Sequence, residues 1–457
     1  MKQKHIQHLY WRAGFGILPG QQSKLSSFSK KEVIDHLFKE SRSLTPLIID
    51  TSDFNIFTEK RIKNNKKLIQ KFIQQSLKRL QSYNVLWLER LANPKELLRE
   101  RMTLFWANHF ACRDNNIFFV QQYNNTLREH ALGDFRQFVK AISKEPAMLK
   151  YLNNKQNVKR SPNENFAREL MELFTLGTGN YSEEDIKESA RAFTGYFHDI
   201  KGSFRLRKLK HDYGLKTFFG KSGYFNGDDI IDIICEEKQC AQFICEKIYR
   251  YFVNENIERA HIDEMVNVFY PKYNIEGLMH HVFMSDWFYD EKHIGTKIKS
   301  PVDFLIGMNN TVSMNFNKPK QLIFLQKALG QLILSPPNVA GWKGGKQWID
   351  SNTILLRLRL PSLLLNSGHI SLAEIGDFKD KFRDFIKRGV TNKIFDVESN
   401  WEQFHKNYNA VETVELENYL LATSFNSGTD KFMTSLNKVS KRDRCIQIMS
   451  LPEYQMC

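Results

Sequence analysis

The sequence predicts a mainly α fold: a large, multi-helix, bundle-like body with a short β-hairpin or loop insertion around residues 196–226. Apolar residues recur at helical spacing through most of the 457 residues. Helix-start residues precede several of these runs. The stretch 196–226 instead alternates in polarity and is rich in Gly. We expect a helical core domain at 1–365 and a helical C-terminal extension at 366–457.

The first helices follow from periodicity and from capping residues. Residues 30–40 place four apolar side chains on one stripe, and residues 66–92 are a long amphipathic run. Asn93 is the expected N-cap of the next helix, with Pro94 at its first position. Residues 117–143 are expected to form one or two helices, broken at Gly133.

The stretch 161–186, "SPNENFARELMELFTLGTGNYSEEDI", contains two helix-start signals. Ser161 and Pro162 are expected to begin one helix, which ends near Gly177. Ser182 is the expected N-cap of the next helix, whose first turn is acidic and so complements the helix dipole. After the 196–226 insertion, helices are expected at 227–253, 260–270 and 275–290, and a turn-rich stretch at 334–353.

Composition limits the functional classes. The net charge of +15 permits an anionic partner, but the basic residues are spread along the chain and are typical of solvated surfaces. We expect no sequence-specific nucleic-acid binding, because no zinc-finger or RNA-binding signature is present. The six cysteines lack metal-ligand spacing and are expected to be reduced, mostly buried thiols.

No apolar segment approaches 18 residues, so no membrane span is expected. The first residues, "MKQKHIQHLYWRAGFG", lack the apolar run of a secretory signal. We therefore expect a cytoplasmic protein or one exported by other means. The absence of GxSxG, HExxH and dinucleotide-binding motifs argues against serine hydrolases of that type, zincins and dinucleotide enzymes.

A carboxylate pair stands out in the 161–186 stretch. Glu169 and Glu172 are three residues apart and share a helix face, and Arg168 can pair with Glu164 and Glu172. One interpretation is a surface ion-pair ladder worth about 0.3–0.5 kcal/mol per pair. The other is a pair of catalytic or metal-binding carboxylates at the mouth of a pocket.

Two further helices carry polar residues on otherwise apolar faces. His109 follows Arg101 in "RMTLFWANHF", and Arg128 and His130 lie in "TLREHALGDF". A His on an aromatic face is most often a satisfied core residue. The alternative is that His109 and His130 are metal ligands and that the two arginines bind an anion.

The segment "KHDYGLKTFFG" places His211, Asp212 and Lys216 on one turn-rich stretch. His211 with Asp212 is compatible with an acid–base pair or with two metal ligands, and Lys216 with an anion clamp. The alternative is an Asp that caps a turn beside a surface His.

Several segments resemble the bacterial domain of unknown function 1800. They include "HLYWRAGFG" at 8–16, "ERMTLFWANHFA" at 100–111, the stretch 127–152, "KSPVDF" at 299–304 and residues 329–356. The stretches 162–197 and 211–234 complete the resemblance, which keeps its order over residues 8–360.

The resemblance implies a largely helical protein without established biochemistry. It also implies a partner, since such proteins are often encoded beside members of the domain of unknown function 1501. Those proteins look like phosphatase or sulfatase relatives and often carry twin-arginine export signals. Such a partner could carry this chain across a membrane in folded form.

Two functional hypotheses remain open. The first is a scaffold or accessory subunit of the phosphatase- or sulfatase-like partner, in which the polar residues hold helices in register. The second is a hydrolase or transferase acting on a carbohydrate or an anionic polymer, with a divalent metal as an open alternative. It requires the polar residues to converge in one site. The catalytic candidates are Glu169, Glu172, His211 and Asp212; the anion-binding candidates are Arg101, Arg128, Arg168 and Lys216; the metal candidates are His109, His130, Glu169 and Glu172.

Overall fold

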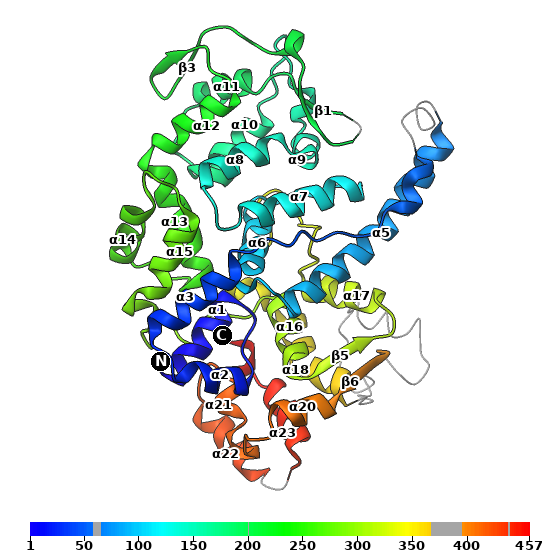
Figure 1. Ribbon diagram of the computed structural model, residues 1–457, viewed down its shortest axis with the longest axis vertical. Helices are drawn as coiled ribbons and strands as arrows, with labels where there is room; N and C mark the ends of the chain where they lie inside the picture. The colour runs from blue at the N-terminus through cyan, green and yellow to red at the C-terminus, as the bar shows by residue number, and fades with distance from the viewer. Residues whose placement is uncertain (58–64, 200, 367–394, 437–438) are drawn as a thin grey trace.

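The computed structural model describes residues 1–57, 65–199, 201–366, 395–436 and 439–457 (Figure 1). Helices make up 62% of the described residues, which also form three two-stranded sheets. This confirms the predicted mainly α class with small β insertions. No helix among the described residues is long and apolar enough to cross a membrane.

Short capping motifs explain where several N-terminal helices begin. Ser29 and Glu32 form a capping box at the start of α3. Asn93 ends α5 instead of starting α6, because it follows the last turn of α5 and α6 begins three residues after Pro94. The predicted break near Gly133 is confirmed. The helices are α1 (Gln3–Ala13), α2 (Pro19–Ser26), α3 (Lys30–Ser41), η1 (Ser52–Ile56), α5 (Lys66–Ala92), α6 (Leu97–His109), α7 (Ile117–His130), α8 (Phe135–Lys144), α9 (Pro146–Tyr151) and η2 (Asn154–Gln156).

The predicted helix after Ser161 is shorter and less regular than expected. It begins at Asn165, because Ser161 instead forms an isolated β-bridge with Val158. After α10 (Asn165–Glu169) the chain continues as η3 (Leu170–Thr175), a π-helical turn. Such turns are rare and occur often at functional sites.

The insertion after α11 (Glu183–Ala192) contains two β-hairpins, as Figure 1 shows at one end of the molecule. The first pairs β1 (Tyr196–His198) with β2 (Phe204–Leu206), followed by η4 (Lys208–Lys210). The second pairs β3 (Lys216–Phe218) with β4 (Lys221–Gly223). Both are antiparallel, so the predicted hairpin region is confirmed within the residues described.

Helices resume after the hairpins and form the flank of the molecule. The capping residue Ser182 of α11 has its partner in Asp185, which confirms the predicted helix start. Helix α14 packs against α13 and α15. The elements are α12 (Gly227–Glu236), α13 (Lys238–Phe252), α14 (Arg259–Phe269), α15 (Ile275–Met284) and η5 (Asp286–Tyr289).

The C-terminal part packs on the helices that precede it. Strand β5 (Ser313–Phe316) pairs with β6 (Val397–Asn400), an antiparallel pairing that sequence periodicity did not indicate. The predicted division at residue 365 stays a prediction, and residues 367–394 of the extension lie outside the described residues. The remaining elements are α16 (Pro301–Thr311), α17 (Lys320–Leu329), η6 (Gly345–Trp348), α18 (Ser351–Leu365), α20 (Trp401–Asn407), η8 (Thr413–Glu415), α21 (Glu417–Leu420), α22 (Ser427–Ser435), α23 (Lys441–Met449) and η9 (Glu453–Gln455).

The core is built from large apolar clusters. The largest extends from α1 to η5, and a second joins α16–α18 to the C-terminal helices. All six cysteines are free and buried, as predicted. Their burial among apolar groups gives them the character of small hydrophobic residues.

Candidate functional site

The predicted carboxylate pair lies at the junction of α10 and the π-helical turn. Glu169 is half-buried, and its pKa is raised by burial and by the neighbouring Glu172. The Tyr181 hydroxyl donates to Glu172 at 3.0 Å. Arg168 pairs with Glu164, as expected, but its second partner is Glu183 and not Glu172. The change of helical winding after Glu169 alters the four-residue spacing on which the pairing with Glu172 depended.

His109 contacts the same π-helical turn from the buried side. Its Nε2 donates to the carbonyl oxygen of Phe174 at 3.0 Å, and burial lowers the pKa of the ring to about 3. The ring is therefore neutral at physiological pH. His130 stacks on Phe138, with ring centroids 5.4 Å apart. The metal roles predicted for these two residues stay predictions.

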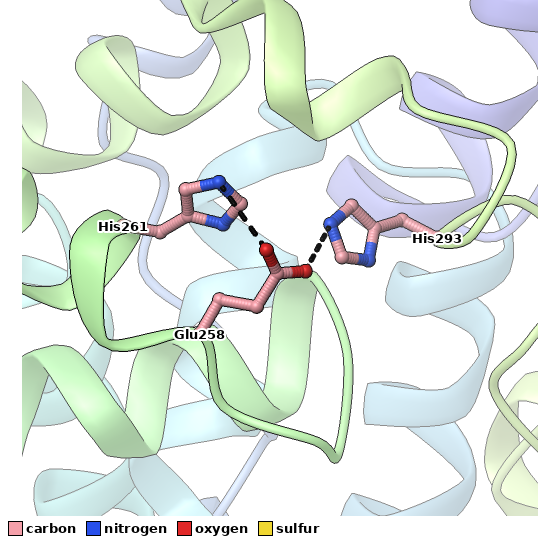
Figure 2. Close-up of side chains that lie close together, drawn as sticks. All are labelled: Glu258, His261 and His293. Atoms are coloured by element: carbon pink, nitrogen blue, oxygen red, sulfur yellow. Dashed lines mark ion pairs between the residues drawn. The ribbon is translucent and has the colours of Figure 1, made fainter.

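Metal-ligand geometry occurs elsewhere in the described residues, at Glu258, His261 and His293 (Figure 2). Their ligand atoms all lie within 4.8 Å of one another. The sequence carried a signal for two of them, because Glu258 and His261 form a Glu-x-x-His pattern of the kind that binds metals from one helix face. Only folding brings His293 beside them.

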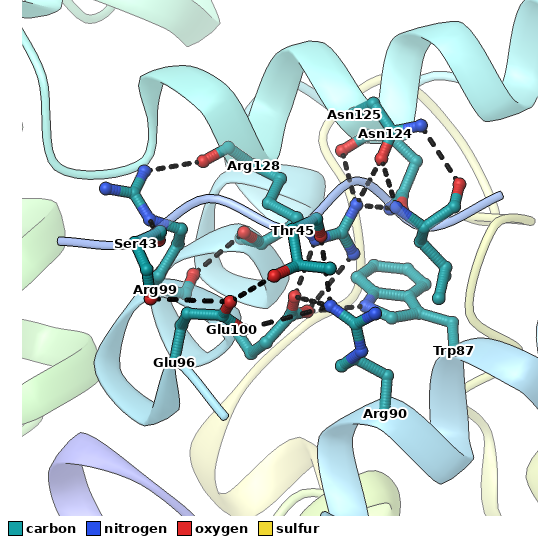
Figure 3. A network of polar contacts seen from close by, with 12 residues as sticks. Ser43, Thr45, Trp87, Arg90, Glu96, Arg99, Glu100, Asn124, Asn125 and Arg128 are labelled. Carbon is teal, nitrogen blue, oxygen red and sulfur yellow. Dashed lines mark hydrogen bonds and ion pairs between the residues drawn. The ribbon is translucent and has the colours of Figure 1, made fainter. Parts of the chain in front are cut away.

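Arg128 belongs to a buried polar network (Figure 3). Its Nε donates to Glu100 Oε1 at 2.6 Å and its Nη2 to Glu100 Oε2 at 3.1 Å. Its Nη1 donates to the side-chain oxygens of Asn124 and Asn125. Trp87 Nε1 donates to the same carboxylate at 3.3 Å. This network links α5, α6 and α7 by hydrogen bonds. The guanidinium donors of Arg128 already have partners within the protein.

The loop residues form a third, separate group. His211 is buried, and its Nδ1 donates to the Thr194 carbonyl at 2.7 Å. Asp212 accepts from Arg191 Nε at 2.8 Å and from the Gly214 N–H at 2.7 Å, so it caps a turn. Lys216 Nζ donates to the carbonyl oxygens of Asp212 and Gly214.

The predicted site residues are thus distributed over several polar groups. In the part of the chain that the structure describes, no hydrogen bond or ion pair joins the Glu169–Glu172 pair to the loop at 211–216. Arg101 lies in a further group, which contains four basic residues that sequence reasoning did not select. We define the basic cluster as Arg12, Arg101, Lys297, Lys299 and Arg357, whose charges act on one another.

The basic cluster assembles from distant segments. Arg12 comes from α1, Arg101 from α6, and Arg357 from α18, while Lys297 and Lys299 precede α16. The segments 8–16, 100–111 and 299–304, which carry the family resemblance, supply three of the five residues. Membership in these segments was the available signal for Arg12 and Lys299.

Aromatic rings and one carboxylate surround the cluster. The Lys299 Nζ atom lies 3.7 Å from the ring centroid of Tyr454 and 4.0 Å from that of Trp11. Arg101 forms an ion pair with Asp303 and lies 4.9 Å from the Tyr251 centroid. Cation–π contacts of this kind are strongest when the cation is desolvated.

Burial sets the charge balance of the cluster. It lowers the pKa of Lys297 and Lys299 to about 7 and that of Arg12 and Arg357 to about 10. Arg101 differs, because Asp303, together with Tyr251 and Cys457, more than offsets the effect of burial and raises the pKa of its guanidinium. The Asp303 carboxylate acts on Arg12, Lys299 and Arg357 as well. Cys457 acts on Arg12, Arg101, Lys297 and Lys299 in the same direction, and Glu255 acts on Lys297, so the five cations outnumber the acidic groups around them.

Several donors of the cluster have no hydrogen-bond partner among the described residues. They are Arg12 Nε and Nη1, Arg101 Nε, Lys299 Nζ, and Arg357 Nε and Nη2. Buried cations are costly unless they are paired and hydrogen-bonded. An oxyanion with several acceptor oxygens would supply both the charge and the acceptors.

A family model described as "Protein of unknown function (DUF1800)" matches residues 8–456. The match continues beyond residue 360, where the resemblance read from the sequence ended, and covers the C-terminal extension. Comparison with curated proteins and with solved structures gives no match.

Proposed function

Because this chain belongs to the DUF1800 protein family, we propose that it is an anion-binding companion of a phosphatase- or sulfatase-like enzyme. The observation that carries the proposal is the basic cluster, in which five cations outnumber the acidic groups beside them and several buried donors have no hydrogen-bond partner among the described residues. The expected partner is the neighbour that the family resemblance implies, a protein of the domain of unknown function 1501.

The composition of the cluster favours a phosphate or sulfate group as ligand. Guanidinium groups bind oxyanions through planar, bidentate hydrogen bonds, while the Lys299 ammonium adds a point charge. Four of the five basic residues are buried, and Lys297 is half-buried. The basic cluster is therefore most accessible to solvent at Lys297. Phosphate or sulfate is also what an enzyme of the expected partner class releases.

Calorimetric titration of the full chain with inorganic phosphate and with sulfate tests this role. We expect wild type to bind at least one of the two. Lys299→Met should weaken binding by about 10- to 100-fold, the value of a hydrogen bond to a charged group. Lys39→Met, at an exposed position, is the matched control and should bind like wild type. Absence of binding, or equal affinity in the two variants, would refute the anion-binding role.

Co-purification tests the companion role separately. We expect a stoichiometric complex when the chain is expressed with its neighbouring phosphatase- or sulfatase-like protein. Fractionation with and without that partner tests the export hypothesis, since a cytosolic location in both cases removes it. A chain that binds anions but never co-purifies with the partner would retain the first role and lose the second.

A catalytic function is the second candidate, and the π-helical turn supports it. The turn places Glu172 beside Glu169, whose raised pKa suits a general acid or base. A hydrolase or transferase acting on a phosphorylated or sulfated carbohydrate fits these groups and the basic cluster. Glu169→Gln should abolish such an activity with little change in thermal stability, while Glu164→Gln, in the adjacent ion pair, should retain it. Equal activity in both variants would remove this candidate.

A further inference from the structure

We propose that Glu258, His261 and His293 bind one divalent transition-metal ion of the zinc type, at a site that shares no side chain with the basic cluster and touches it only where Arg12 Nη2 donates to the His293 carbonyl at 2.8 Å. Two imidazoles and one carboxylate form the ligand set of many catalytic zinc centres, which keep a further position open. The three side chains come from the N-terminus of α14 and from the loop after η5, and they point toward one another in Figure 2.

The spacing of the ligand atoms supports this proposal. Nε2 of His261 lies 3.7 Å from Glu258 Oε2, and Nε2 of His293 lies 3.6 Å from Glu258 Oε1. Both separations are too long for ordinary hydrogen bonds. They are close to the distance of about 3.4 Å between neighbouring ligands of a tetrahedral ion with bonds of about 2.1 Å.

The environment of the two rings is that of a supported site. His293 is 1% exposed, and its Nε2 has no hydrogen-bond partner among the described residues although it is aimed at the carboxylate. His261 is held by Tyr249, whose hydroxyl lies 3.1 Å from Nδ1, and by Trp287, which stacks on it at 4.4 Å. Outer contacts of this kind orient metal-binding imidazoles.

The carboxylate is more accessible than the rings. The side chain of Glu258 is 38% exposed, which leaves a route from solvent to the open position. Lys292 Nζ lies 2.8 Å from Glu258 Oε2. It therefore competes with a metal ion for the negatively charged Glu258 carboxylate. Because the Lys292 side chain is 51% exposed, it can leave when the ion binds. Lys292→Met should therefore raise the affinity for the metal.

One contact opposes metal binding and gives a sharp test. Asn254 Oδ1 accepts from the Asn256 N–H, and its Nδ2 donates to the Lys292 carbonyl, so the amide nitrogen faces His293 Nδ1 at 3.1 Å. A metal on Nε2 requires the ring proton on Nδ1, where it needs an acceptor. Asn254→Asp supplies that acceptor as a carboxylate, and we expect it to tighten metal binding by about 10-fold or more.

The experiment uses the full chain after treatment with a chelator. Titration with Zn²⁺ is followed by calorimetry, and titration with Co²⁺ by its visible absorption, which reports four-coordinate geometry. We expect one ion per chain in wild type. Glu258→Gln and His293→Ala should each weaken binding by more than about 100-fold. His36→Ala, which removes an exposed imidazole paired with Glu40, is the matched control and should bind like wild type.

Two results would overturn the site: no four-coordinate Co²⁺ spectrum in wild type, or unchanged affinity in Glu258→Gln. If His293→Ala does not fold, the variants at the partly exposed positions, Glu258→Gln and Lys292→Met, decide the question, because they must change the metal affinity in opposite directions. Equal affinity in these two variants also refutes the proposal. Neither outcome depends on phosphate or sulfate binding, so this test and that of the basic cluster can fail separately.

Discussion

Replacing Lys299 by Met should stabilise the folded chain most strongly below pH 7. Burial lowers the pKa of this amine from its ordinary value of 10.5 to about 7. A base with a lowered pKa in the folded state destabilises that state fully below the folded pKa, and the penalty disappears as the pH rises toward 10.5. At about 1.36 kcal/mol per pH unit, the penalty is about 5 kcal/mol at pH 6 and about 2 kcal/mol at pH 9.

Urea unfolding followed by tryptophan fluorescence at both pH values measures this effect. Met fills a similar volume against Trp11 and Tyr454, so any packing difference is the same at pH 6 and pH 9. The gain in the free energy of unfolding should therefore be about 3 kcal/mol larger at pH 6. Added phosphate should reduce the difference in the free energy of unfolding between Lys299→Met and wild type. The reason is that the bound anion offsets the buried Lys299 charge, which only wild type carries.

The control is Lys39→Met, which should change stability little and equally at the two pH values, since the side chain is exposed. A Lys299→Met variant that is less stable than wild type at pH 6 would refute the reasoning. So would a gain that does not depend on pH. Either result would mean that the amine is charged and satisfied in the folded chain, and the case for a missing anion would be lost.

Three further substitutions test other parts of the structure by the same unfolding measurement. Burial raises the pKa of Glu145 to about 7, so Glu145→Gln should stabilise by about 3 kcal/mol at pH 8 and by nothing at pH 4; equal effects at both pH values would contradict this. Arg128→Met should cost about 3–5 kcal/mol, because it removes the closest partner of the buried Glu100 carboxylate and leaves only Arg90 at 3.6 Å and the Trp87 N–H; a loss below about 1 kcal/mol would show that the network does not fix the helices. Gly341→Ala should destabilise by more than about 1 kcal/mol, since φ is 79° there and an added Cβ would lie 2.3 Å from Asn108 Oδ1; an unchanged midpoint would contradict that close packing.

Local rules explain the parts of the fold that were predictable. The capping boxes at Ser29 and Ser182 and the long run 66–92 depend on residues within one turn of each other, so their sequence signals are complete. The start of α6 was misplaced, because Asn93 and Pro94 also suit the end of a helix followed by a linker. The π-helical turn was not predictable, since a single extra residue per turn leaves the apolar pattern almost unchanged.

The candidate sites depend on long-range packing. Spacing along the chain can pair Glu258, the N-cap of α14, with His261 in the first turn of that helix, but it cannot place His293 beside them. The same limit applies to the basic cluster, in which Arg12 and Lys299 are neighbours in space although they are 287 residues apart in the sequence (299 minus 12).

The sequence by itself determined the helical class, most helix positions and the family, because these depend on local periodicity and on residue order. Only the tertiary structure decided which polar residues are hydrogen-bonded within the protein and which retain unpaired donors or metal-ligand atoms. The reason is physical: whether a buried polar group is satisfied depends on partners that the fold brings from distant segments, and sequence spacing describes only neighbours on one element.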